Sequence, residues 1–281
     1  MHSRNSDNTV ESRLDVLDLR ISNVEVRVFA PQAVLSILET TLADVPRHRS
    51  EIVAVEVRAE LSNSLWSVTA TPGTQRLIMP AESILPQVAG AVVSTILRSI
   101  VSEDVRVARA VVIEYQGRGL AIVGEDWESA LTISAHLCTR GWQYVSGDHA
   151  LIDGRTLKAV GFEKALYMTS STLTTLPQNY RRAVESSPWY VTKHGIAFYA
   201  VDPSTAAGRP AWSTSAPLHA VIVVDGQIDE TPSLEVIPGS ALAAPLQELG
   251  IDWGKLEVAR VSLGHFIETC DLIENWFATL A

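Results

Sequence analysis

Residues 105–141 constrain the fold more than any other part of the chain. The apolar run GLAIV (119–123) follows a polar turn, QGRG, and precedes Gly124 and a segment with the apolar spacing of a helix. A short apolar run bounded by turn residues is typical of a buried strand. A strand joined to a helix through a glycine is also where many proteins hold phosphate. The order of elements therefore predicts an α/β core.

Size and charge limit the classes of protein to which the chain can belong. Its 281 residues can bury the core of one large domain or of two small ones. The formal net charge of −10 argues against nucleic acid as a partner, because phosphate backbones bind clustered lysine and arginine. Lysine is scarce, and it occurs only after Gly124, at Lys158, Lys164, Lys193 and Lys255.

Cysteine usage and hydropathy predict a cytoplasmic protein without membrane contact. Cys138 and Cys270 are too few for a disulfide framework or a cysteine metal site, so we expect two buried free thiols. The polar N-terminus lacks the apolar stretch of a signal peptide. The longest apolar segment, 84–101, contains proline, glutamine and arginine, and we interpret it as a buried helix.

A change of pattern near residue 104 predicts two domains. After a tail over residues 1–13, which we expect to be disordered, residues 14–103 predict a small α/β domain of strands and two helices. Residues 104–281 form the second predicted domain. Helices are expected at 31–45, within 84–101, in a segment ending at Arg140–Gly141, at 241–250 and at 263–280.

As a phosphate-binding loop, the segment after Gly124 lacks the necessary residues. In G-x-x-x-x-G-K-[ST], glycines let backbone N–H groups converge on the phosphates, the lysine supplies charge and the hydroxyl holds the metal. Counted from Gly124, the second glycine is Ser129, the lysine is Ala130 and the hydroxyl is Leu131. The motif alone gives no reason to expect a nucleotide.

The surroundings of this segment resemble the HPr kinase/phosphorylase family and its looser relatives from peptide-modification gene clusters. EYQGRGLAIVG is similar to the family's hairpin and loop start, ESALTISAHLCTRGWQYV to its helix and next strand, and SGDHALID to its S-D-D-x-A-L-I-D. The resemblance covers residues 109–148 without a gap, continues more weakly to the C-terminus and leaves the first domain uncovered. It implies an HPr-kinase-like (P-loop/PEP-carboxykinase-like) fold for residues 104–281.

Carried over position by position, the resemblance implies that most of the family's chemical residues are replaced. The catalytic histidine falls on Arg109 and the loop lysine on Ala130. The metal-binding hydroxyl falls on Leu131, and the first aspartate of an acidic pair falls on Gly147. Asp148 matches the second aspartate.

Electrostatics leads to the same expectation without the family. Glu125, Asp126 and Glu128 lie where phosphates would bind, and two like charges about 4 Å apart cost roughly 4 kcal/mol at an effective dielectric near 20. Carboxylates at a helix start instead satisfy its free N–H groups and the positive end of its dipole. Trp127 adds bulk where a glycine would admit a phosphate. We therefore interpret residues 124–131 as a degenerate loop and expect no cofactor or metal.

Other candidates have a structural and a functional interpretation. Asp148 is a remnant metal ligand or base, or a turn residue. Arg109 binds an anion, or makes surface or ion-pair contacts. His149 follows Asp148, but adjacent strand residues point to opposite faces, which argues against a working pair. His136 is assigned to the helix surface, and His265 has no companion at ligand spacing.

Three functions are compatible with these residues, and we favour the first. It is a catalytically inactive, pseudokinase-like protein that binds or scaffolds a protein or peptide, in keeping with the relatives from peptide-modification clusters. The second is an ATP- and Mg²⁺-dependent phosphotransferase with a rebuilt site that uses Lys158, Lys164 or Lys193. The third is unrelated small-molecule chemistry. A homo-oligomer, formed through a strand edge or the C-terminal helix, is compatible with each.

Overall fold

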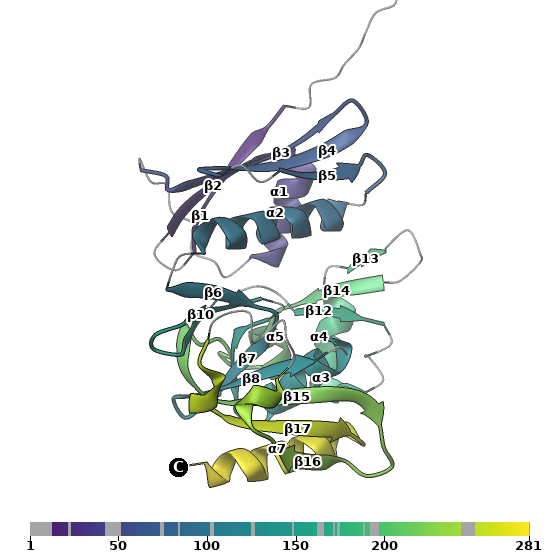
Figure 1. Cartoon of the computed structure of the whole chain (residues 1–281). Coiled ribbons are helices and arrows are strands. Elements are labelled where there is room, and N and C mark those ends of the chain that lie inside the picture. The colour runs from purple at the N-terminus through teal and green to yellow at the C-terminus, as the bar shows by residue number, and fades with distance from the viewer. Residues whose placement is uncertain are drawn as a thin grey trace, which may run out of the picture. The chain divides into compact units, whose positions relative to one another are not determined.

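A computed structural model gives the structure of the protein, which forms two compact units (Figure 1). The N-terminal unit comprises Met1–Glu39 and Pro46–Ile100, and the C-terminal unit comprises Thr40–Val45 and Val101–Ala281. The structure describes residues 13–21, 24–42, 52–73, 76–83, 85–101, 104–124, 127–147, 149–161, 166–170, 172, 175–187, 189–191, 197–242 and 251–280. Most of the expected tail, residues 1–12, lies outside these ranges.

The N-terminal unit is a five-stranded sheet with two helices on one face. Neighbouring strands are antiparallel except for β2 (Val24–Ala30) and β3 (Val55–Ser62), which are parallel because α1 (Gln32–Thr41) connects them. Apolar residues alternate along the first four strands, and one face is buried beneath α1 and α2 (Leu85–Ile100). The strands in sheet order are β1 (Asp15–Ile21), β2 (Val24–Ala30), β3 (Val55–Ser62), β4 (Leu65–Thr71) and β5 (Arg76–Pro80).

The C-terminal unit is built around the long strand β15 (Ser215–Ile228). One edge of β15 pairs in parallel with β8 (Arg118–Gly124). The other edge pairs first with β11 (Lys158–Val160), antiparallel, and then with β17 (Glu257–Leu263), parallel. The remaining strands of this sheet are β6 (Val105–Ala108), β7 (Val111–Tyr115), β9 (Gln143–Ser146), β10 (Ala150–Asp153) and β16 (Ser233–Val236).

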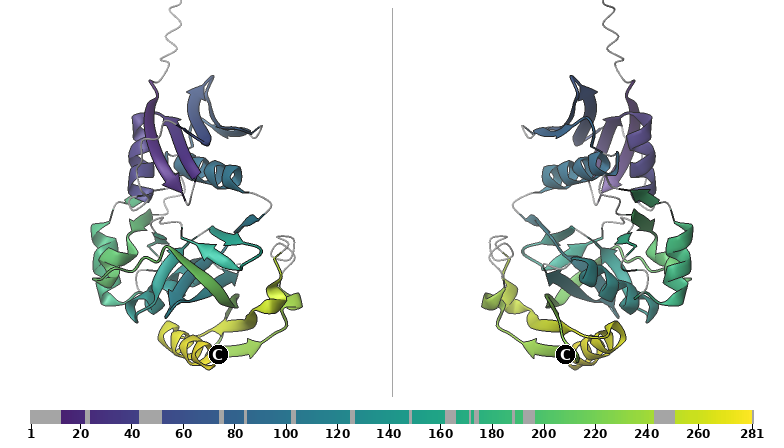
Figure 2. Two further views of the ribbon diagram at one scale, coloured as in Figure 1. Left: turned by 90° about the vertical axis from the view of Figure 1, so that its left-hand side faces the viewer. Right: turned by 90° about the vertical axis from the view of Figure 1, so that its right-hand side faces the viewer.

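Helices cover one face of this sheet. Helix α3 (Trp127–Thr139) packs against β8 and against the C-terminal helix α7 (Phe266–Thr279), and Figure 2 shows α7 in yellow beside β16 and β17. Leu120 and Ile122 of β8 belong to the apolar cluster beneath these helices, whereas Ala121 and Val123 belong to a cluster on the opposite face. Burial on both faces explains why β8 is a continuous apolar run in the sequence.

A smaller three-stranded sheet completes the C-terminal unit, together with two short helices. Its strands, in sheet order, are β12 (Leu166–Thr169), β14 (Ala197–Val201) and β13 (Trp189–Val191). The helices are α4 (Gln178–Ser186) and α5 (Pro203–Ala207), which pack against each other. Short 3-10 turns occur at Gly239–Ala241 and Trp253–Lys255.

Several expectations from the sequence are confirmed. The QGRG turn joins antiparallel β7 and β8, and Gly141 follows α3 with a φ of 115°. Both cysteines are buried and free. Of the helix expected at 241–250, residues 243–250 lie outside the described ranges. Among the helices of the described residues, none is long and apolar enough to cross a membrane.

Candidate functional site

The connection between β8 and α3 is shorter than a phosphate loop requires. Strand β8 ends at Gly124 and α3 begins at Trp127, so Glu125 and Asp126, which lie outside the described residues, are the whole connection. In G-x-x-x-x-G-K-[ST], the four residues between the glycines form the cradle for the phosphates. Here the last two of the four, Trp127 and Glu128, are already helical.

The motif positions that follow are turned into the core. The exposed fraction is 0% for Ala130 and 5% for Leu131, and both belong to the apolar cluster between α3 and the sheet. Ser129 is buried as well, whereas Glu128 is exposed. An ammonium group at position 130 would therefore be desolvated among apolar side chains, where burial of a charge is costly.

The sheet explains Gly124 without a phosphate. Gly124 is paired with Val224 of the neighbouring strand β15. A Cβ atom at position 124 would lie 2.5 Å from the carbonyl oxygen of Val224, closer than real Cβ atoms approach backbone. The glycine that marks the loop in the sequence is therefore required by the close approach of two backbones.

Arg109 and Trp127 meet beside the short connection. The guanidinium carbon of Arg109 lies 5.3 Å from the ring centroid of Trp127, a cation–π contact. The Arg109 side chain is exposed, and the half-buried Trp127 ring packs against the main apolar cluster. Arg109 was expected to bind an anion or to make surface or ion-pair contacts, and its exposed side chain lies over an aromatic ring.

His149 does not lie in a strand, as the sequence interpretation assumed. Asp148 lies outside the described residues, and His149 lies in a bend before β10, where its carbonyl accepts a hydrogen bond from Ser146 Oγ at 2.6 Å. A Cβ at Gly147 would overlap the hydroxyl of buried Tyr144. A carboxylate at position 147 therefore requires Tyr144 to move. Among the described residues, no three or more His, Cys, Asp or Glu side chains gather as they would around a metal ion.

The two described lysines lie at the wrong end of the sheet to replace a loop lysine. Lys158 is paired with Pro217, seven residues before Val224 on β15, which corresponds to about 23 Å. Lys255 precedes β17, which runs parallel to β15 and ends near the level of the loop. Lys164 and Lys193 lie outside the described residues.

A second candidate site, not expected from the sequence, lies at the other end of α3. It is a groove of about 670 Å³ formed by the end of α3, the segment that leads into α4 and the start of α7. We call it the His136 groove. The side chains that define it are those of His136, Arg140, Thr175, Pro177, His265 and Phe266.

The assignment of His136 to the helix surface is wrong. Its exposed fraction is 5%, and Nε2 lies 2.8 Å from the carbonyl oxygen of Thr175, so Nε2 carries a hydrogen and donates it. The ring lies nearly parallel to that of Phe266, with centroids 6.1 Å apart and an angle of 8°. Burial lowers the pKa of His136, and the positive charges of Arg140 and His265 lower it further against the effect of the Thr175 carbonyl.

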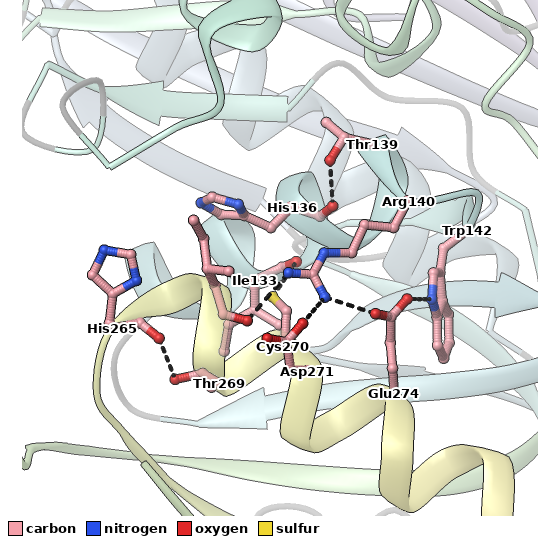
Figure 3. Close-up of polar contacts among 11 residues, drawn as sticks. Ile133, His136, Thr139, Arg140, Trp142, His265, Thr269, Cys270, Asp271 and Glu274 are labelled. Carbon is pink, nitrogen blue, oxygen red and sulfur yellow. Dashed lines mark hydrogen bonds and ion pairs between the residues drawn. The ribbon is translucent and has the colours of Figure 1, made fainter. Parts of the chain in front are cut away.

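Arg140 joins the end of α3 to α7 (Figure 3). Its Nη1 donates to Asp271 Oδ1 at 2.6 Å and to Glu274 Oε2 at 2.7 Å, and Nη2 donates to the carbonyl of Ile267 at 3.2 Å. Glu274 Oε1 accepts a further hydrogen bond from Trp142 Nε1 at 3.0 Å. Burial alone would lower the pKa of Arg140, but the bonds to Glu274 and Asp271 raise it.

His265 lines the groove together with His136, a proximity that its sequence context did not indicate. It is the residue before the first turn of α7, and its exposed side chain lines the same groove as His136, from which it is separated by more than a hundred residues in the chain. Its carbonyl accepts a hydrogen bond from Thr269 Oγ1 at 3.2 Å. No spacing rule along one helix could have brought these two histidines together.

Comparisons with known proteins identify no family. No protein-family model and no curated protein matches the chain. The solved structure of the Hpr(Ser) kinase/phosphatase from Coxiella burnetii is similar over 62% of this chain and 91% of its own, with 16% identity and a TM-score of 0.32. A similarity at this TM-score carries no argument about sites or activity. The described residues form a mixed α/β structure, and the family relationship stays a prediction from the sequence.

Proposed function

We propose that this chain is a catalytically inactive relative of HPr kinases that binds a protein or peptide partner instead of transferring phosphate. The observation that supports this most directly is the start of α3 at Trp127, which places Ala130 and Leu131 in the apolar core. The positions that the resemblance assigns to the loop lysine and the metal-binding hydroxyl are thus occupied by packing side chains.

Opening a phosphate cradle here would cost several interactions at once. The first turn of α3 would have to unwind to free its N–H groups. Leu131 would leave the core, which costs about 1.5–3 kcal/mol for a leucine side chain. The exposed carboxylate of Glu128 would then repel the incoming phosphates. These costs add to the loss of the Arg109–Trp127 contact.

The alternative, an ATP-dependent phosphotransferase with a rebuilt lysine, receives no support from the described lysines. Lys158 and Lys255 both lie toward the end of the parallel strands that is opposite to Gly124. An ammonium group about 20 Å away cannot stabilise charge on a transferred phosphoryl group, because the interaction is screened beyond about 8–10 Å.

The test is titration of ATP, ADP and GTP, each with Mg²⁺, followed by thermal unfolding. A ligand at about 100 times its Kd stabilises the native state by roughly 2.7 kcal/mol, so a bound nucleotide would raise Tm clearly. We expect no change with any of the three. A rise in Tm that is lost in Arg109→Ala would place a nucleotide beside the loop and contradict the proposal. Gly124→Ala is unsuitable for this purpose, because its Cβ meets Val224 whether or not nucleotide binds.

The resemblance to relatives from peptide-modification clusters supports a precursor peptide or its modifying enzyme as the partner. Binding between the purified chain and the purified products of the adjacent genes, measured by calorimetry, tests this part of the proposal. Saturable binding that is unaffected by Mg²⁺-ATP is the expected result. Binding that requires Mg²⁺-ATP would favour the phosphotransferase instead.

A further inference from the structure

We infer that the His136 groove is a docking site for a short peptide segment in which an apolar side chain adjoins a lysine or arginine. The groove begins nine residues after Trp127 on α3, which corresponds to about 14 Å along the helix. It is therefore separate from the connection after Gly124. The inference holds whether or not that connection binds a nucleotide, so it does not rest on the proposed function.

The walls of the groove suit an apolar side chain. Phe266 is half-buried against the main apolar cluster, and Leu176 and Pro177 lie on the side of α4. Ile267, in the first turn of α7, is 48% exposed at the rim. A volume of about 670 Å³ is in the range of sites that take a few side chains rather than a folded domain. Exposed apolar residues around a hollow are typical of a binding surface.

His136 contributes a flat, uncharged wall at neutral pH. Its Nε2 hydrogen is already donated to the Thr175 carbonyl, and the ring is stacked with Phe266. Burial keeps the imidazole neutral, because a charged ring at this position would also face Arg140 and His265. The histidine therefore adds contact area without attracting an anion.

Charge complementarity at the α7 rim selects a cationic neighbour for that apolar side chain. Arg140 already donates to Asp271, Glu274 and the Ile267 carbonyl, so its guanidinium is committed within the protein (Figure 3). Asp271 remains 57% exposed, and Glu268 is exposed one turn before it. Glu268, Asp271 and Glu274 thus supply three carboxylates within the first three turns of α7, and two of them pair with Arg140.

The α4 side of the groove has a cationic side chain next to it. Arg181 of α4 donates from Nη2 to the carbonyl of Leu176 at 3.4 Å, beside the groove. Arg140, which lines the groove, is paired with Asp271 and Glu274, so the excess of carboxylates lies on α7. A lysine or arginine fits against Glu268 and Asp271, whereas an acidic or phosphorylated segment would face two exposed carboxylates there.

Fluorescence polarisation with a set of short labelled peptides tests the inference. Each peptide carries one anchor, leucine, isoleucine, phenylalanine or tryptophan, flanked on both sides by lysine, serine or glutamate. We expect members of the lysine set to bind, with an affinity that falls as NaCl is added, because part of the attraction is between exposed charges. The serine set should bind more weakly, and the glutamate set should not bind.

Two variants and two matched controls locate the binding. Ile267→Glu should weaken binding of the lysine set about tenfold or more, and Val236→Glu, at a comparably exposed residue of β16, should leave it unchanged. Glu268→Lys should weaken binding of the lysine set and spare the serine set, whereas Glu257→Lys at the exposed start of β17 should not. Unchanged far-UV circular dichroism and Tm establish that each variant is folded.

Several results would overturn the assignment. They are an absence of binding by every peptide of the set, equal binding of the glutamate set, and lysine-set binding that survives Ile267→Glu. Sedimentation velocity could give one further result that would overturn the assignment. A dimer that forms with rising concentration and is lost in Ile267→Glu would show that a second copy of the chain occupies the groove.

Discussion

The two ends of helix α3 differ: the end that the sequence marks with a motif-like glycine is packed, and the other end opens into a groove. The N-terminal end follows the glycine that resembles a phosphate loop, and it is filled by Trp127, Arg109 and the apolar side chains behind them. The C-terminal end carries no recognisable motif, and it opens into the His136 groove. A motif-like segment can thus be a packing element, while the usable surface of the same helix lies about two and a half turns away.

The difference arises from what each end of α3 contacts. At the N-terminal end, β8 and β15 approach so closely that Gly124 has no room for a side chain. At the C-terminal end, Arg140 holds α7 through two carboxylates, and the start of α7 stands beside His136. Substitutions at each end can test whether packing closes the N-terminal end of α3 and whether these contacts keep the C-terminal end open.

The largest effect is expected when the loop lysine is restored. Ala130→Lys buries an ammonium among apolar side chains, so we expect a loss of about 3–5 kcal/mol in the free energy of unfolding, measured with denaturant. Glu128→Lys, two residues earlier and exposed, should cost less than about 1 kcal/mol. Ala130→Lys combined with Leu131→Ser should still not bind Mg²⁺-ATP. Binding by this double variant would mean that the packing at the N-terminal end does not exclude nucleotide.

The next effect concerns the close approach of β8 and β15. Gly124→Ala should lower the free energy of unfolding by about 1–3 kcal/mol, because its Cβ meets the carbonyl of Val224. Gly90→Ala, at an open and exposed position of α2, should instead raise it by about 0.5–1 kcal/mol. If Gly124→Ala leaves the free energy of unfolding unchanged, β8 and β15 separate easily and close packing is not the reason for the glycine.

A smaller, pH-dependent effect is expected at the C-terminal end of α3. The pKa of His136 is lowered in the folded state, so the folded protein binds this proton less readily than the unfolded chain. Stability associated with neutral His136 is present above the unfolded pKa of about 6.5 and is lost as the pH falls below it. Denaturant unfolding should show a decline from pH 7.5 to pH 5 that is reduced in His136→Gln, whose amide can still donate to Thr175. An equal decline in both proteins would contradict this assignment.

The smallest effect is expected for the contact between Arg109 and Trp127 at the N-terminal end of α3. Arg109→Ala should cost about 0.5–1 kcal/mol, the value of an exposed cation–π contact. A double-mutant cycle with Trp127→Leu isolates the contribution of the pair from that of each side chain. If the two losses simply add, the ring and the guanidinium do not interact, and the closed end is held by apolar packing alone.

Part of the candidate site could be predicted from local sequence. The run GLAIV predicts a strand buried on both faces, and Gly141 predicts the end of the following helix, because these signals depend on neighbouring residues. The burial of His136 could not be predicted in this way. All residues from 129 to 138 are buried, including serine and threonine, since Thr132 Oγ1 and Ser134 Oγ donate to carbonyls of their own helix. Their polarity therefore suggested a solvent-facing side that α3 does not have.

The sequence by itself determined the order of strand, glycine and helix, the absence of a lysine from the motif position and the apolar character of the segment. Only the tertiary structure decided which end of α3 is open and why Gly124 is a glycine. The reason is that those properties depend on partners far along the chain. Arg140 meets Asp271 and Glu274 across 131 and 134 residues, and Gly124 meets Val224 on another strand. Such contacts have no local periodicity, so they are visible only after the chain has folded.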